Sequence, residues 1–121
     1  MPEPLDPPTI DTAIYAELQA TAGAEFVAEL VDTFLEEAPP MLAELRDALA
    51  QRSAERFRRA AHSLKSNGHT FGATPLAVLA RALELGGLPA DAVSLDALDA
   101  LDALDAEYAR AAAALKELAH V

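Results

Sequence analysis

Residues 58–72 read RRAAHSLKSNGHTFG, and this stretch decides the fold. Apolar or small residues recur through it at steps of three and four, a spacing that puts them on one face of an amphipathic helix. Ser53 suits the N-cap of this helix and Gly72 suits its C-cap. The helix therefore presents to a core the stripe formed by Phe57, Ala61, Leu64, Gly68 and Phe71.

The polar side of the same helix carries a histidine beside a lysine. His62 directly follows Ala61, a core position, so we expect its side chain to point away from the apolar stripe and toward water. Lys65 and Ser66 lie three and four residues further on, on the same face. His69 is seven residues from His62, which places the two rings within about 20° around the helix axis. We therefore predict an exposed imidazole flanked by a fixed positive charge.

The pattern continues beyond this helix and resembles a known family. Ala61-His62-Ser63-Leu64-Lys65, followed by Gly72-Ala73, Leu76, Leu79 and Leu83-Glu84, is similar to the histidine-containing phosphotransfer (HPt) domain of bacterial phosphorelays. The family pattern is Ala-His-x-Leu-Lys-Gly, a glycine six residues later, and a leucine-rich helix that ends in Leu-Glu. Ser66 departs from it, because the family usually has glycine there, where a small residue leaves room for a partner. The resemblance implies phosphorylation of His62 on Nε2 with Lys65 assisting.

The rest of the chain indicates an all-α fold with no strand pattern. Four prolines in residues 1–8 disfavour a helix, so we assign residues 1–10 to a flexible tail and 11–121 to one helical domain. Four long helices joined by short links predict an antiparallel up-down-up-down four-helix bundle, with a first short helix across one end. The resembled family has this architecture. The expected helices cover about residues 12–22, 24–50, 53–71, 75–86 and from 95 onward.

Capping residues and prolines refine these boundaries. Asp11 or Thr12 suits the N-cap of the first helix, Thr74 that of the fourth, and Asp91 or Ser94 that of the last. Two consecutive prolines, at positions 39 and 40, fall inside the second helix, where each removes a hydrogen bond. We therefore expect a kink or a short break there, and the resemblance favours a bent, nearly continuous helix.

Composition excludes several classes of protein. The 121 residues suit one domain, and the absence of cysteine rules out disulfides and thiolate metal sites. The N-terminus is no signal peptide and no apolar run could span a bilayer, so we expect a soluble, cytoplasmic monomer. A net charge of −11 argues against nucleic-acid binding. Residues 46–81 form the basic zone, with seven basic and two acidic residues. Its arginines serve either solubility or the attraction of an acidic partner or phosphoryl group.

His62 is the candidate nucleophile, because a neutral imidazole can attack phosphorus and a nearby ammonium stabilises the charge on the oxygens. The chain has no nucleotide-binding motif, so phosphate must come from another protein. The resemblance implies a phosphocarrier without kinase activity, which relays phosphate between aspartates of receiver domains, in a hybrid histidine kinase and a response regulator. It implies Mg²⁺ on the receiver and no cofactor on this chain.

Other candidate residues surround His62, each with a simpler alternative. Ser66 and His69 are candidate neighbours of the phosphate, or ordinary surface residues. Arg58 and Arg59 either contact an acidic partner or pair with Glu55. By analogy with the family architecture, Ile14 of the first helix adds an apolar docking patch near the histidine.

Two other functions fit the same residues. One is a bundle that docks and regulates a receiver or kinase without carrying phosphate. The other is a metal-dependent enzyme that uses His62, His69 and carboxylates. The two histidines lack the i, i+4 spacing of helical zinc ligands, so we predict no metal site.

Overall fold

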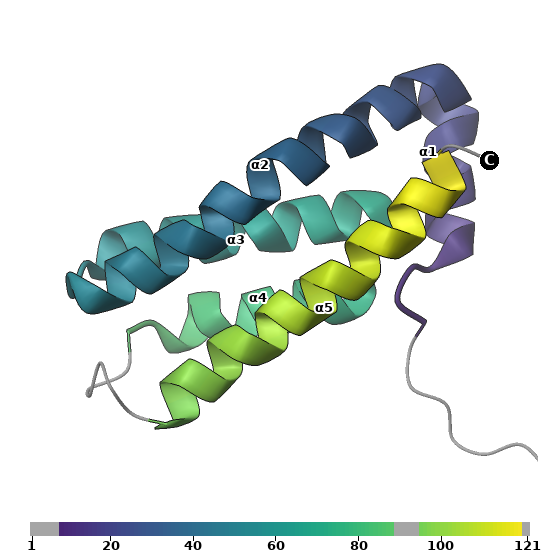
Figure 1. Cartoon of the computed structure of the whole chain (residues 1–121). Helices are drawn as coiled ribbons and strands as arrows, with labels where there is room; N and C mark the ends of the chain where they lie inside the picture. The colour runs from purple at the N-terminus through teal and green to yellow at the C-terminus, as the bar shows by residue number, and fades with distance from the viewer. Residues whose placement is uncertain (1–7, 89–94, 120–121) are drawn as a thin grey trace, which may run out of the picture.

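The computed structural model describes residues 8–88 and 95–119, and the regular structure within these ranges is helical (Figure 1). This confirms the all-α prediction. No helix in this part of the chain is both long and apolar enough to cross a membrane. The helices are α1 (Thr12–Ala22), α2 (Ala24–Ala50), α3 (Ala54–Phe71), α4 (Thr74–Gly86) and α5 (Leu95–Ala119).

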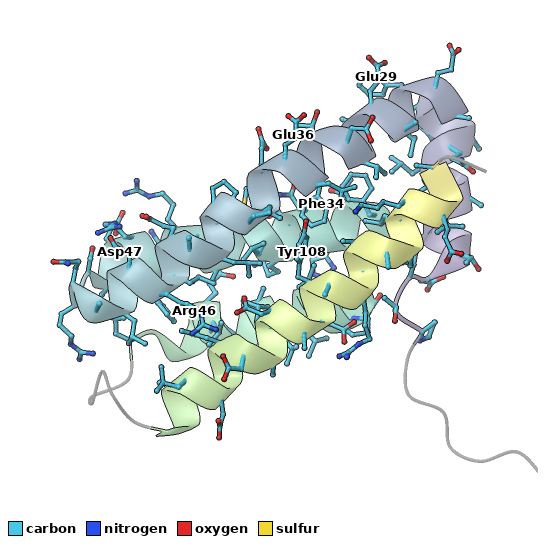
Figure 2. The ribbon with its side chains drawn as sticks, in the orientation of Figure 1. Glu29, Phe34, Glu36, Arg46, Asp47 and Tyr108 are labelled. Atoms are coloured by element: carbon cyan, nitrogen blue, oxygen red, sulfur yellow. The ribbon has the colours of Figure 1, made fainter. Side chains whose placement is uncertain are left out.

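The long helices pack in a closed ring around one apolar core. Helix α2 contacts α3 and α5, and α4 contacts the same two, while α1 contacts α2 and α3 at one end (Figure 1). The ring of Phe34 on α2 lies 5.4 Å from that of Phe71 on α3 and 5.8 Å from that of Tyr108 on α5 (Figure 2). The largest fully buried side chains are Phe57, Leu45, Leu64, Leu76, Leu104, Leu115, Val27 and Val31.

Most helix ends lie where the sequence predicts them. The Asp11 carboxylate accepts from the main chain at the start of α1, and the Ser53 hydroxyl accepts from the amide of Arg56 at the start of α3. Gly72 ends α3 in the left-handed conformation, with φ of 77°. The Thr74 prediction is wrong by one position, because Ala73 is the N-cap and Thr74 is already helical. The caps proposed for the last helix lie outside the described residues.

Helix α2 continues as one helix through Pro39 and Pro40. Of the two predicted outcomes, the short break is absent and the continuous helix that the resemblance favours is present. Proline has no amide hydrogen, so Pro39 cannot donate to the carbonyl of Leu35 one turn earlier. The hydroxyl of Tyr108 on α5 donates to that carbonyl instead, at 3.5 Å. A hydrogen bond between α5 and α2 thus takes the place of the main-chain hydrogen bond that Pro39 cannot form.

Helix α1 is joined to the end of α3. Ile10, inside the predicted tail, is 5% exposed and belongs to the core, so packing reaches the chain before α1 begins. The amide of Asp11 donates to the carbonyl of Gly72 at 2.7 Å. A Cβ at Gly72 would lie only 2.7 Å from the carbonyl oxygen of Asp11, so this junction requires glycine.

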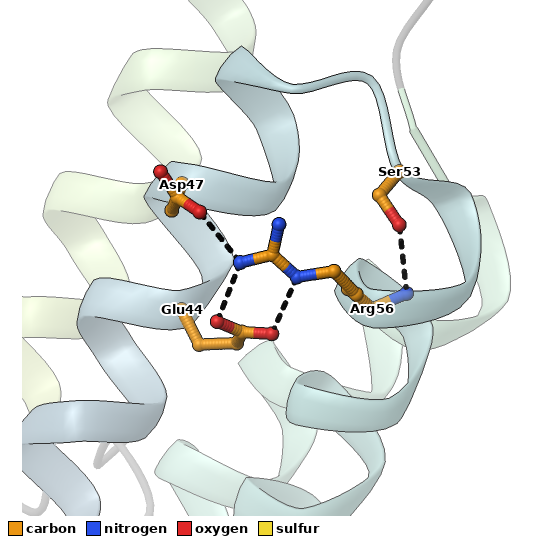
Figure 3. A network of polar contacts seen from close by, with 4 residues as sticks. All are labelled: Glu44, Asp47, Ser53 and Arg56. Atoms are coloured by element: carbon orange, nitrogen blue, oxygen red, sulfur yellow. Dashed lines mark hydrogen bonds and ion pairs between the residues drawn. The ribbon is translucent and has the colours of Figure 1, made fainter.

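An arginine network links α2 to α3 near their connection. Nε and Nη2 of Arg56 donate to the two carboxylate oxygens of Glu44, at 2.8 and 2.7 Å, and Nη2 also donates to Asp47 at 2.5 Å (Figure 3). The guanidinium of Arg56 lowers the pKa of Glu44 below its ordinary value. This bidentate pair holds the two helices in register at the end of the bundle that lies farthest from α1.

Candidate functional site

The site depends on a close approach of α3 and α4. Gly68 of α3 lies against the first turn of α4, and a Cβ added there would be 3.1 Å from both the Cβ and the amide nitrogen of Ala77. With only a hydrogen at this point, the helices come close enough for side chains on their outer faces to meet. His62 and Glu84, 22 residues apart in sequence, meet in this way.

His62 stands on the outer face of α3 with 53% of its side chain exposed. Its Nδ1 lies 2.7 Å from Oε2 of Glu84. A carboxylate can only accept, so Nδ1 carries a hydrogen, and in the neutral ring the lone pair is on Nε2. Nε2 has no hydrogen-bond partner among the described residues. In that tautomer Nε2, the nitrogen predicted to attack phosphorus, has its lone pair available on a half-exposed side chain.

Glu84 also binds the lysine of the site. Nζ of Lys65 lies 2.8 Å from Oε1 of Glu84, and the two side chains are 22% and 14% exposed. The ammonium of Lys65 first, and then the Nδ1–H of His62, hold the pKa of Glu84 below its ordinary value of 4.5. Glu84 is therefore a carboxylate at neutral pH and bridges the two residues predicted to act on phosphate.

Sequence reasoning included Glu84 in the family pattern but assigned it no role. The available signal was its position, one residue after the leucine seam of α4, on the side of the helix that turns toward α3. Its partners could not be identified from that position, because the contact depends on how closely α3 and α4 pack.

This arrangement suits a nucleophile. A carboxylate that accepts from Nδ1 orients the imidazole, fixes its tautomer and stabilises the positive charge that the ring gains when Nε2 attacks. Lys65 shares that carboxylate and lies one turn further along α3, where a cation can reach the oxygens of a group held on the ring.

The other residues predicted to act beside His62 do not contact it. Ser66 and His69 are exposed on α3, and neither forms a hydrogen bond or ion pair with His62 in the described part of the chain. Ile14 of α1 is 37% exposed and lies beside Gly72, where an added Cβ would be 3.1 Å from its Cβ. Ten residues of α3 separate that point from His62, or about 15 Å along the helix axis. A partner that covers both must span several helical turns.

The basic zone is largely paired within the protein. Arg58 and Arg59 both contact Oε2 of Glu55, at 3.5 and 3.2 Å, as the simpler alternative for them proposed. Their side chains are 53% and 69% exposed, so such surface pairs are weak and can be exchanged for others. Arg46 of α2 binds Asp102 and Asp105 of α5 (Figure 2). A docking role for the two exposed arginines stays a prediction.

Within residues 8–88 and 95–119, no group of three or more histidine and carboxylate side chains is arranged to hold a metal ion. In the site itself, the single carboxylate already binds an ammonium and an imidazole N–H. Its Oε2 bonds to the imidazole, and its Oε1 is in an ion pair with the ammonium.

Comparisons with known proteins agree with this geometry. A family model described as Hpt domain matches residues 29–114. Among solved structures, the chain is similar to histidine-containing phosphotransfer protein B (HptB) from Pseudomonas aeruginosa PAO1, with a TM-score of 0.80 and 26% sequence identity. The match covers 94% of this chain and 96% of that one. None of the curated proteins compared with the chain matches it.

Proposed function

The chain belongs to the Hpt domain family, and from this premise we propose that it relays a phosphoryl group between aspartates of receiver domains through His62. One observation carries the proposal. His62 is half exposed, and its Nδ1 is held by Glu84, so Nε2 is left free for attack. An exposed nucleophile suits a protein whose phosphate donor is another protein.

The proposed reaction is a direct transfer in each direction. The lone pair of Nε2 attacks the phosphorus of an aspartyl phosphate; the N–P bond forms while the P–O bond breaks, and its electron pair goes to the aspartate carboxylate. The ring becomes positively charged, and Glu84 stabilises it through the Nδ1–H. Lys65 exchanges one oxygen of Glu84 for an oxygen of the phosphoryl group. Attack by the aspartate of a second receiver then reverses the steps.

Several features follow from this role. The Mg²⁺ that neutralises phosphate charge belongs to the receiver, and this chain acts as a phosphocarrier without kinase activity. We propose that the protein is cytoplasmic and is an antiparallel four-helix bundle. We propose that it works as a monomer, because each receiver must reach the same exposed face. The partners are the receiver domain of a hybrid histidine kinase and that of a response regulator. Arg58, Arg59 and Ile14 are proposed to contact them, and Ser66 and His69 to lie beside the bound phosphate.

The test is incubation with a receiver domain that carries aspartyl phosphate, in the presence of Mg²⁺. We expect acid-labile, base-stable phosphate on His62, located by mass spectrometry. His62→Gln should abolish the label. His69→Gln removes the other exposed histidine of α3 and should retain a label on His62, because His69 is proposed to lie beside the phosphate and not to bond to phosphorus.

Two results would contradict the proposal. Equal labelling of both variants would place the phosphate elsewhere. A stable complex with the receiver that never acquires label, and is unaffected by His62→Gln, would favour the alternative of a bundle that docks and regulates without carrying phosphate.

A further inference from the structure

The proposed phosphotransfer requires Lys65 to leave a buried oxygen. Nζ of Lys65 lies 2.8 Å from Oε1 of Glu84, and this oxygen is buried. When the ammonium turns to the phosphoryl group, Oε1 loses it. Removal of one partner from a buried ion pair leaves the other charge uncompensated, which is unfavourable. A second cation that reaches Glu84 would remove this cost.

Arg81 of α4 is available for this role. Most residues of the basic zone form ion pairs with acids of the protein, namely Arg46, Arg56, Arg58, Arg59 and Lys65. The side chain of Arg81 is exposed and forms no hydrogen bond or ion pair with the residues that the structure describes. Its guanidinium can therefore move to a new acceptor without breaking such a contact.

The position of Arg81 places it on the same side of α4 as Glu84. Ala77, Arg81 and Glu84 are spaced at i, i+4 and i+7, so they share one side of the helix. Ala77 packs against Gly68 of α3, and Glu84 reaches His62 of α3. Arg81 thus lies between two contacts with α3, about one helical turn from the carboxylate.

An arginine and a glutamate three residues apart form an ion pair elsewhere in this protein. Nη2 of Arg110 lies 2.6 Å from Oε1 of Glu107 on α5. In that pair the acid comes first, whereas Arg81 precedes Glu84, and this order is less favourable on a helix. A weaker pair fits the structure, in which Lys65 holds the carboxylate and Arg81 does not.

We propose that Arg81 is a positioning residue, which takes the place of Lys65 at Glu84 when Lys65 turns to the phosphoryl group. Its guanidinium then donates to Glu84, and the carboxylate keeps its hydrogen bond to Nδ1 of His62. No covalent bond changes in this exchange. The inference rests on the proposed function, but the exchange can be tested without a phosphate donor, because Lys65→Met removes the ammonium.

The first test is the pKa of the Glu84 carboxyl, measured by carbon-13 NMR titration in a double-mutant cycle. The signal of Glu84 is assigned by its loss in Glu84→Gln. In the parent chain, Arg81→Gln should raise the pKa of Glu84 by less than about 0.2, because Lys65 is the partner. In Lys65→Met, Arg81→Gln should raise the pKa by about 0.5, the size expected for one close charge in water.

Two controls make this test specific. Arg81→Lys in the Lys65→Met chain keeps the charge and should preserve most of the effect of arginine. Lys116→Gln removes the same charge at an exposed position of α5, a helix that packs on α2 and α4, and it should leave the pKa of Glu84 unchanged. Equal effects of Arg81→Gln with and without Lys65 would overturn the inference, whether or not a receiver labels His62.

The second test is the single-turnover rate of His62 phosphorylation over a range of receiver concentrations. Arg81→Gln should lower the maximal rate about two- to fivefold, the range expected from the loss of one surface ion pair. The half-saturating receiver concentration should not change. A changed half-saturating concentration with an unchanged maximal rate would overturn the inference and assign Arg81 to contact with the receiver. Absence of label in the parent chain would overturn the proposed function, and with it the purpose of the exchange, even where the first test detects the exchange.

Discussion

Replacement of Gly68 by alanine tests the close helix contact on which the proposed phosphotransfer site depends. Gly68 is buried in α3, and an added Cβ would be 3.1 Å from the Cβ and the amide nitrogen of Ala77 and 3.2 Å from the carbonyl oxygen of Ala73. Carbon atoms pack best at about 3.5–4.0 Å, so α4 must move by a few tenths of an ångström.

The magnitude follows from two opposing effects. Alanine gains about 1 kcal/mol over glycine inside a helix. Overpacking of a close contact costs about 1–3 kcal/mol. The free energy of unfolding of Gly68→Ala should therefore fall by about 0–2 kcal/mol, despite the better helix propensity. All three close atoms are backbone or Cβ atoms, which cannot rotate away, and this favours the upper half of the range.

The chain provides a matched control in Gly86, the last residue of α4. An alanine Cβ there would meet nothing within 4 Å, and Gly86 does not have a positive φ. Gly86→Ala should therefore show the propensity gain alone, at most about 1 kcal/mol.

Both variants are compared with the parent chain by urea unfolding monitored by far-UV circular dichroism. The reasoning is refuted if Gly68→Ala is as stable as Gly86→Ala, because α3 and α4 would then not be in contact at Gly68.

Three further predictions concern other sites. Tyr15→Phe should leave the free energy of unfolding unchanged or raise it, since the Tyr15 hydroxyl is buried without a partner among the described residues. Thermal unfolding checks this, and a fall in the free energy of unfolding of more than about 1 kcal/mol would contradict it. The lowered pKa of Glu84 stabilises the fold above pH 4.5, and this contribution is lost as the pH falls through the folded-state pKa. Lys65→Met removes the largest cause of the lowered Glu84 pKa, so the free energy of unfolding of this variant should fall less steeply than that of the parent chain as the pH is lowered. Urea unfolding at several pH values measures this dependence. An unchanged dependence on pH would mean that Lys65 does not lower the pKa of Glu84. Glu84→Ala should slow phosphorylation of His62 by a receiver about 10–100-fold, by analogy with other residues that orient a reactive group through a hydrogen bond. The single-turnover rate of phosphorylation measures this, and an unchanged rate would show that Glu84 has no part in the reaction.

The helices and their ends could be predicted because their signals are local. Ser53 and Gly72 bound α3 through the conformations and hydrogen bonds of a few neighbouring residues, and the three-and-four spacing separates Phe57 and Leu64 from His62 around one helix. Exposure of His62 follows from that same spacing. The match of residue types to the Hpt family then indicated its chemistry.

Contacts between helices could not be predicted in this way. The prolines of α2 left a kink or short break and a nearly continuous helix both possible, and the sequence did not show that a hydroxyl from α5 supplies a donor to the carbonyl that Pro39 leaves unpaired. The sequence left open whether the arginines of residues 46–81 serve solubility or attract an acidic partner, and it did not show that Arg46 and Arg56 bind acids of α5 and α2. Each outcome depends on side chains that are distant in sequence.

The sequence by itself determined which face of α3 meets water and that His62 stands on it, because helix periodicity depends only on neighbouring residues. Only the tertiary structure decided that Glu84 holds Nδ1 of His62 and the ammonium of Lys65 together. That contact spans two helices, and it exists because the missing side chain at Gly68 lets α3 and α4 approach closely enough for a carboxylate to reach both partners.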